Sequence, residues 1–196
     1  IGIAMGITGT DVAKETSDMI LTDDNYASIV SAVEEGRVIY SNIRKFVYYL
    51  LSCNVGEILV VFLATLLGRT LGWEVLPLTA IQLLVLNLVT DGAPALALGL
   101  ERGEPDIMKR PPRDPEEPVI DRLMTRGIIL QGIAITVATL GAFQLALWRQ
   151  PGDWAHAQTM AFATLSVAEL VRAYTSRSEL YPLHRLGVFT NSALQW

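Results

Sequence analysis

The sequence predicts an all-α membrane protein with four transmembrane helices, a long cytosolic stalk helix and a small α/β segment at the N-terminus. Its 196 residues are 51% hydrophobic and only 18% charged, against about 25% charged in an ordinary soluble domain. Four runs with at most one acidic side chain each cover residues 46–68, 75–100, 127–148 and 154–171. Each run reaches or approaches the roughly 20 residues that a bilayer-spanning helix needs.

Composition excludes several other classes of protein. The chain has 15 Lys and Arg against 20 Asp and Glu, and this net charge of −5 argues against nucleic acid as a partner. A single cysteine excludes a disulfide scaffold or a zinc ribbon, and the apolar content excludes disorder. The chain opens at Ile1 without an initiator Met or a basic signal segment, and ends at Trp196 where the sequence turns apolar again. We therefore expect a fragment of a longer polypeptide.

Residues 1–25 predict the end of a larger cytosolic α/β domain. Residues 1–5 are typical of a short buried strand, Thr10 can cap a short helix, and residues 19–22 are typical of a second strand. A β-α-β segment of this size cannot hold a hydrophobic core of its own. It therefore belongs with a larger domain.

Residues 26–45 predict a stalk helix that is continuous with the first span. The Asp-Asp-Asn run at 23–25 offers N-cap side chains, and apolar residues then follow at helical spacing with no proline before Pro77. One helix over residues 26–67 would be roughly 60 Å long, about twice the hydrocarbon thickness of a bilayer. Such a helix would join a cytosolic domain rigidly to the centre of the membrane.

The positions of the cations predict the orientation. All of the 15 Lys and Arg except Arg69 and Arg149 precede the first span, lie in the loop 101–126, or follow the fourth span in 172–196. Cations collect on the cytoplasmic side, so we expect both ends of the chain there. The proline-rich loop 101–126 is typical of a solvated linker or of a segment docked on a cytosolic domain. Residues 172–196 are expected to form a cytosolic loop and the start of another transmembrane helix.

Polar residues near the middle of the spans form a candidate metal site. Ionisable groups inside a membrane are costly and mark functional sites by default. Three of the spans carry such residues at helical spacing, whereas the third carries only side chains suited to packing. The candidate ligands are Asn54 and Glu57 in the first span, Asn87, Thr90 and Asp91 in the second, and Glu169 in the fourth.

The backbone near Pro94 is expected to contribute as well. Proline lacks an N–H, so the carbonyl of Thr90 loses its helical partner, and an unwound turn is expected here. All of these ligands are hard oxygen donors, which suit calcium and, less specifically, magnesium, sodium or protons. Two alternatives remain open: that Asn54 or Thr90 serves only as a hydrogen-bonding contact between helices, and that Glu169 pairs with Arg172.

Several motifs, in order along nearly the whole chain, resemble those of P-type ATPases, and most closely the calcium pumps of the sarco/endoplasmic-reticulum type and their bacterial relatives. The resemblance covers the end of the phosphorylation domain, the stalk and transmembrane helices five to eight. The motifs are Gly2-Ile3-Ala4-Met5-Gly6, Gly9-Thr10-Asp11, Val33-Glu34-Glu35-Gly36-Arg37, Asn54-Val55-Gly56-Glu57, Asn87-Leu88-Val89-Thr90-Asp91-Gly92, and Asp106-Ile107-Met108-Lys109-Arg110-Pro111-Pro112.

The resemblance implies a pump that transports calcium through an aspartyl phosphate. The residues implied for one calcium site are Asn54, Glu57, Thr90, Asp91 and Glu169, and those implied for part of a second are Asn87 and Asp91. ATP and magnesium would bind outside this chain, which lacks the Asp-Lys-Thr-Gly and Thr-Gly-Glu-Ser motifs and the nucleotide-binding domain. Catalytic residues are therefore expected elsewhere.

The implied partners are the actuator, nucleotide-binding and phosphorylation domains, helices one to four and the lipid bilayer. In a bacterium this bilayer would be the plasma membrane. The alternatives are a P-type pump for sodium, manganese or protons, and a non-enzymatic four-helix membrane module such as a channel or an assembly subunit.

Overall fold

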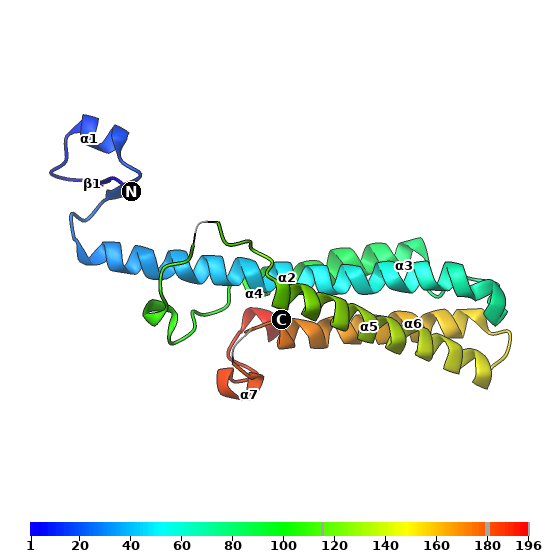
Figure 1. Ribbon diagram of the computed structural model, residues 1–196. Coiled ribbons are helices and arrows are strands. Elements are labelled where there is room, and N and C mark those ends of the chain that lie inside the picture. Colours follow the sequence, from blue (N-terminus) through cyan, green and yellow to red (C-terminus); the bar gives the residue numbers. More distant parts are fainter. Residues whose placement is uncertain (115, 179–180, 196) are drawn as a thin grey trace. The chain divides into compact units, whose positions relative to one another are not determined.

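The computed structural model describes residues 1–114, 116–178 and 181–195 (Figure 1). The described residues form two compact units, which we call the stalk unit (residues 1–41 and 102–112) and the bundle unit (residues 42–101 and 113–196). Pro115 of the predicted loop, and residues 179–180 and 196 of the predicted C-terminal segment, lie outside the described residues.

The stalk unit begins with the expected β-α-β segment. Strands β1 (Ile3–Met5) and β2 (Met19–Leu21) pair in parallel, with Ile3 opposite Met19, and helix α1 (Asp11–Thr16) connects them. The Thr10 hydroxyl caps α1 by accepting a hydrogen bond from the backbone N–H of Ala13 at 3.3 Å. The small α/β segment predicted at this end is confirmed.

Helix α2 (Ala27–Leu71) is a continuous helix of 45 residues, as the absence of proline predicts (Figure 1). The Asn25 side chain accepts a hydrogen bond from the N–H of Ala27 at 3.0 Å and so satisfies one free donor at the start of the helix. The predicted stalk and the predicted first span therefore belong to one element.

Part of the proline-rich loop is held against the stalk portion of α2. The Arg37 guanidinium donates hydrogen bonds to the carbonyls of Ile107 and Arg110 at 2.8 and 2.7 Å. These carbonyls flank the 3₁₀ turn η2 (Ile107–Lys109). Arg110 in turn pairs with Asp106 and Glu104. This part of the loop packs on the stalk helix and is not a free linker.

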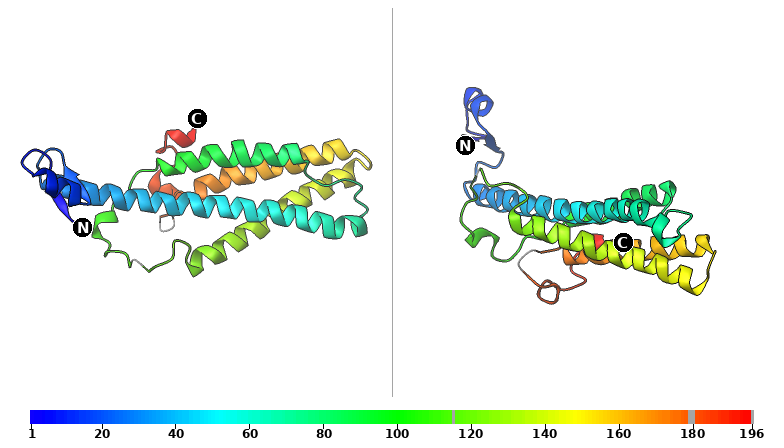
Figure 2. Two further views of the ribbon diagram at one scale, coloured as in Figure 1. Left: turned by 90° about the horizontal axis from the view of Figure 1, so that it is seen from above. Right: turned by 45° about the vertical axis from the view of Figure 1, so that its right-hand side comes forward.

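The bundle unit contains the remaining long helices. Helix α3 (Ala80–Val85), the π-helical turn η1 (Leu86–Asp91) and helix α4 (Gly92–Gly99) follow one another without a break. Helices α5 (Arg122–Arg149) and α6 (Trp154–Thr175) are joined by a short turn and pack along each other (Figure 2).

Within the described residues, three helical stretches are long and apolar enough to cross a membrane: Ala27–Leu71, Ala80–Gly99 and Arg122–Arg149. Helix α6 has 22 residues, or about 33 Å at 1.5 Å per residue, which is sufficient length for a bilayer. It is less apolar than the others because it carries His156, Gln158, Glu169 and Arg172. The fourth span therefore stays a prediction.

Helices α2 and α5 approach closely at two glycines. A Cβ atom on Gly132 would lie 2.7 Å from Cγ1 of Val55, and one on Gly56 would lie 3.0 Å from Cγ2 of Ile135. The Thr136 hydroxyl lies 3.3 Å from the Gly56 carbonyl and 2.6 Å from the carbonyl of Gly132 in its own helix. Small residues and hydroxyls of this kind hold membrane helices together, in keeping with the packing role expected for the third span.

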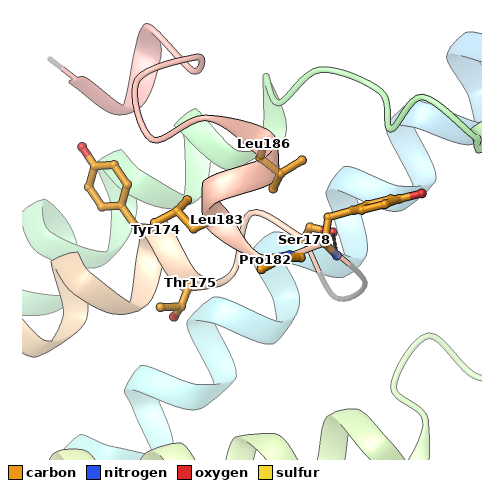
Figure 3. A pocket seen from close by; sticks show the side chains of 7 residues that line it. Tyr174, Thr175, Ser178, Pro182, Leu183 and Leu186 are labelled. Atoms are coloured by element: carbon orange, nitrogen blue, oxygen red, sulfur yellow. Dashed lines mark hydrogen bonds between the residues drawn. The ribbon is translucent and has the colours of Figure 1, made fainter.

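The C-terminal part of the bundle unit contains helix α7 (Leu183–Leu186) and the 3₁₀ turn η3 (Ala193–Gln195). A pocket of about 440 Å³ lies between the end of α6 and α7 (Figure 3). Its lining includes Leu183 and Leu186 as well as the hydroxyl-bearing residues Thr175, Ser178 and Tyr181, so its walls are partly apolar and partly polar.

Candidate cation site

Two of the predicted ligands are joined directly. The amide nitrogen Nδ2 of Asn87, on η1, lies 2.9 Å from Oε2 of Glu57 on α2. The carboxylates of Glu57 and Asp91 also interact electrostatically, and Glu169 on α6 interacts with both. The structure thus brings the three predicted acidic residues of α2, η1 and α6 into one neighbourhood.

All three acidic side chains are buried. Glu57 is 5% exposed, Asp91 is 1% exposed and Glu169 is fully buried. Buried polar atoms in folded proteins almost always have hydrogen-bond partners. Here five buried oxygens have none: Oε1 of Glu57, Oγ1 of Thr90, Oδ2 of Asp91, and both carboxylate oxygens of Glu169. Carboxylate and hydroxyl oxygens with free lone pairs are the donors that a hard cation such as calcium takes.

The backbone around Asp91 is wound differently from the prediction. The expectation of an unwound turn is wrong, because residues 86–91 form a π-helical turn within a continuous helical stretch. Unwinding would leave several backbone groups unpaired in an apolar environment, whereas a widened turn keeps most of them bonded. The Thr90 carbonyl accepts a hydrogen bond from the Tyr49 hydroxyl at 2.8 Å.

Tyr49 contacts two of the candidate ligands and was not predicted from the sequence. Its hydroxyl lies 3.2 Å from Oδ1 of Asp91 as well as close to the Thr90 carbonyl, and its side chain is fully buried. The buried Cys53 side chain also interacts electrostatically with Asp91. The available signal was helical spacing, because Tyr49 and Cys53 lie eight and four residues before Glu57 and so share its face of α2.

The remaining predicted ligands are less enclosed. The Asn54 amide nitrogen donates to the carbonyl of Leu50 in its own helix at 2.8 Å, and the side chain is half-buried. Asn87 is exposed apart from its contacts with Glu57 and Leu83. Among the described residues, no three His, Cys, Asp or Glu side chains come close enough together to hold a metal ion by themselves. Any cation here needs other oxygens besides the three carboxylates.

The alternative pairing of Glu169 with Arg172 does not occur in the structure. The Arg172 guanidinium lies over the Tyr48 ring, with 4.3 Å between its central carbon and the ring centroid. It donates to the Thr175 hydroxyl at 2.9 Å, and its Nη2 lies 3.4 Å from Oγ of Ser52. Arg172 thus turns toward α2, and both oxygens of Glu169 are left without a hydrogen bond.

Long apolar helices with acidic side chains buried among them define this chain as part of a multi-pass membrane protein. The chain belongs to the cation-transporting ATPases: residues 75–196 match the family described as "Cation transporting ATPase, C-terminus".

Three calcium-transporting ATPases with similar sequences support this family assignment. The chain is 54% identical over 179 residues to a calcium-transporting ATPase of Bacillus subtilis, covering 91% of the chain and 20% of the relative. It is 45% identical over 209 residues to calcium-transporting ATPase 1 of Bacillus cereus, covering 99% of the chain and 23% of the relative. It is 50% identical over 147 residues to the endoplasmic reticulum-type calcium-transporting ATPase 2 of Arabidopsis thaliana, covering 74% of the chain and 13% of the relative. The chain thus spans between 13% and 23% of the length of these relatives.

Proposed function

We propose that this chain is the part of an ATP-driven calcium pump that supplies most of the calcium site within the membrane. The observation that carries the proposal is the set of buried, unpartnered oxygens on Glu57, Thr90, Asp91 and Glu169. They come from three different helical elements and are of the kind that calcium prefers. The names of the relatives, all calcium-transporting ATPases, point to the same ion.

In this proposal the ion is cargo, and the chain's residues bind and release it. Glu57, Asp91 and Glu169 supply negative charge, while Thr90 and Asn54 supply neutral oxygens. Asn87, together with Asp91, contributes to a second site whose other ligands lie in parts of the pump outside this chain. Phosphorylation of an aspartate, and the binding of ATP and magnesium, also belong to those other parts.

Helix α2 is the element that couples the two ends of the pump in this proposal. It carries Glu57 at the site and continues through the stalk as one helix of 45 residues. A change in a cytosolic phosphorylation domain would move α2, and with it one of the carboxylates. Affinity for the ion would then alternate with the phosphorylation state.

The proposed topology has four spans, with α6 as the fourth, and both ends of the chain in the cytoplasm. The distribution of the cations supports it, because 13 of the 15 Lys and Arg fall in the segments that this topology places on the cytoplasmic side. In a bacterium the pump would lie in the plasma membrane. The remaining domains of the same polypeptide and the lipid bilayer would be its partners.

The Asp91→Asn variant of the full-length protein tests this function. We expect calcium-dependent phosphorylation by ATP to be abolished, because Asp91 contributes to both proposed sites. Thr139→Val is the matched control, since Thr139 is also a fully buried polar residue with an unpartnered hydroxyl but lies on α5. Undiminished calcium dependence in Asp91→Asn would contradict the site, and stimulation of the wild type by sodium or manganese in place of calcium would contradict the choice of ion.

A further inference from the structure

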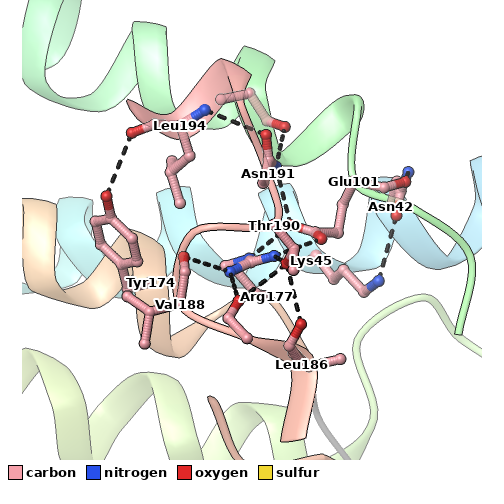
Figure 4. A network of polar contacts seen from close by, with 12 residues as sticks. Asn42, Lys45, Glu101, Tyr174, Arg177, Leu186, Val188, Thr190, Asn191 and Leu194 are labelled. Atoms are coloured by element: carbon pink, nitrogen blue, oxygen red, sulfur yellow. Dashed lines mark hydrogen bonds and ion pairs between the residues drawn. The ribbon is translucent and has the colours of Figure 1, made fainter. Parts of the chain in front are cut away.

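Another buried acidic residue, Glu101, lies just beyond the end of α4 and pairs with Arg177, just beyond the end of α6 (Figure 4). Glu101 is 7% exposed and Arg177 is 1% exposed. Nε of Arg177 lies 2.8 Å from Oε2 of Glu101, and Nη2 lies 2.8 Å from Oε1. The two side chains therefore meet edge to edge in the paired geometry that fixes both position and direction.

The pair is fully built into its surroundings. Nη1 of Arg177 donates to the carbonyls of Gly187 and Val188 at 2.8 and 2.9 Å, and Nη2 also donates to the Thr190 hydroxyl at 2.6 Å. An arginine side chain has five N–H donors, and these contacts account for all of them. The guanidinium therefore has a single well-defined position.

Two asparagines extend the network to further elements. The Asn191 amide donates to Oε2 of Glu101 and to the Ala97 carbonyl of α4, both at 2.9 Å. The Asn42 amide, on α2, donates to the carbonyls of Glu101 and Gly99 at 2.7 and 3.2 Å. The Glu101–Arg177 network thus connects α2, α4 and the segment after α6.

The charges of Glu101 and Arg177 compensate each other despite their burial, and the buried Lys45 of α2 adds a further cation that interacts with Glu101. Burial acts to raise the pKa of the Glu101 carboxyl, but the hydrogen bonds from Arg177 and Asn191 outweigh it and hold that pKa below its ordinary value. Hydrogen bonding to Glu101 raises the pKa of Arg177. Both groups therefore stay charged, and the pair stays intact, at neutral pH.

The three elements that the network connects are continuous with those that carry the buried carboxylates. Along the chain, Asp91 lies ten residues before Glu101, Glu169 lies eight before Arg177, and Glu57 lies fifteen after Asn42. At 1.5 Å per residue these separations correspond to about 15, 12 and 22 Å along helices. The network therefore contacts α2 within its length and α4 and α6 at their C-terminal ends, at one side of the candidate cation site.

We propose that the Glu101–Arg177 network is a positioning device for the cation site, which sets the axial register of α2, α4 and α6 so that their carboxylates meet. This inference rests on the proposed function, since it assigns the network to the same site. A bidentate ion pair with every donor used permits one register, whereas apolar packing alone permits helices to slide. Replacing a buried ion pair by apolar side chains often costs no stability, so positioning can be separated from stability by experiment.

The test uses the Glu101→Met/Arg177→Met double variant of the full-length protein, which removes both members of the ion pair and leaves Lys45 with its hydrogen bond to Asn42. We expect the calcium concentration for half-maximal ATP hydrolysis to rise several-fold, with an unchanged KM for ATP and a melting temperature close to that of the wild type. The matched control is Glu104→Met/Arg110→Met, another Glu–Arg pair, whose two members belong to the same loop. It should change none of these values.

Oxidative cross-linking of Cys53 to an introduced Ala173→Cys measures the register without relying on activity. Cys53 on α2 and Ala173 on α6 lie in the same buried cluster. We expect the cross-link to form more slowly in the double variant than in the background with the intact network. An unchanged rate, or an unchanged calcium dependence, would overturn the positioning role. A wild-type protein that calcium does not activate would instead contradict the proposed function, while the cross-linking rate would still decide whether the network sets the register.

Discussion

Among its described residues, the bundle unit buries acidic side chains in two places, and their surroundings differ in the partners that they provide. In the Glu101–Arg177 network, both carboxylate oxygens of Glu101 accept hydrogen bonds from charged or amide donors. At the candidate cation site, neither oxygen of Glu169 has a partner, although this side chain is even more deeply buried. Both places contain residues from α2, from the continuous stretch of η1 and α4, and from α6 or the segment that follows it.

Under the proposed function, this difference separates an acid with a structural role from acids that bind the ion. A buried carboxylate without a partner is unfavourable, and a fold that needed only stability would pair it or replace it. The fold demonstrates at Glu101 that it can supply a fitted partner. The unpartnered oxygens of Glu57, Asp91 and Glu169 are therefore best explained by a ligand that binds them.

The largest effect on stability is expected when one member of the Glu101–Arg177 pair is removed. Arg177→Met leaves the Glu101 carboxylate buried without its cation, and we expect the free energy of unfolding to fall by about 3–5 kcal/mol. Thermal unfolding of the purified full-length protein measures this loss. Arg185→Met is the control, because Arg185 is exposed on α7 and its loss should leave the unfolding temperature unchanged. An equally small effect of both variants would show that the network contributes little.

The corresponding change at the candidate site should have the opposite sign. Glu169→Gln removes a buried carboxylate with no partner, so we expect unfolding in the absence of calcium to become more difficult by about 1 kcal/mol. The same variant should lose calcium-dependent phosphorylation. A destabilised Glu169→Gln protein would indicate that Glu169 has a structural role. The contrast between the candidate cation site and the Glu101–Arg177 network would then disappear.

The features that the sequence predicted are those that can be recognised from single residues and their immediate neighbours in the chain. Glu57, Asp91 and Glu169 stand out because each lies in an apolar run where charge is costly. The uninterrupted α2 followed in the same way from the absence of proline. The β-α-β segment followed from a capping threonine between two short apolar runs.

The sequence did not predict the features that depend on distant pairs. Glu101 and Arg177 are 76 residues apart, and each stands in a polar segment where a charge is ordinary. An irregular turn near Pro94 was predicted, but its π-helical form was not, and the Tyr49 hydroxyl that donates to the Thr90 carbonyl there comes from another helix. The sequence also did not predict the partners of Arg172. Its side chain is long enough to reach either Glu169 in the same helix or a residue of another helix such as Tyr48.

Acid should weaken the Glu101–Arg177 pair over a pH range that follows from the lowered pKa of Glu101. The folded state holds the pKa of Glu101 below its ordinary value of 4.5, so the stabilisation is present above that value and is lost as the pH falls through the lower folded-state pKa. The loss is about 1.4 kcal/mol for each pKa unit by which the two states differ. We therefore expect the difference in unfolding temperature between the wild type and Glu101→Gln to be largest at neutral pH and to shrink in acid. A difference that is independent of pH would show that Glu101 is not held as a carboxylate.

The smallest expected effect concerns two threonine hydroxyls, one buried without a hydrogen-bond partner and one with partners. The Thr90 hydroxyl is buried without a partner at the candidate site, whereas the Thr136 hydroxyl contacts two carbonyls, those of Gly132 and Gly56. Thr90→Val should therefore stabilise the protein in the absence of calcium by up to about 1 kcal/mol. Thr136→Val should destabilise it by about 1 kcal/mol.

Both of these changes replace a hydroxyl by a methyl group of nearly the same shape, so packing is conserved and the sign of the effect reports on hydrogen bonding alone. Unfolding temperatures of the two variants, measured side by side with and without calcium, give that sign. Calcium should protect the wild type more than Thr90→Val, because the valine lacks an oxygen for the ion. It should protect Thr136→Val as well as it protects the wild type. Equal protection of all three proteins would exclude Thr90 from the site and leave its hydroxyl as a contact between helices.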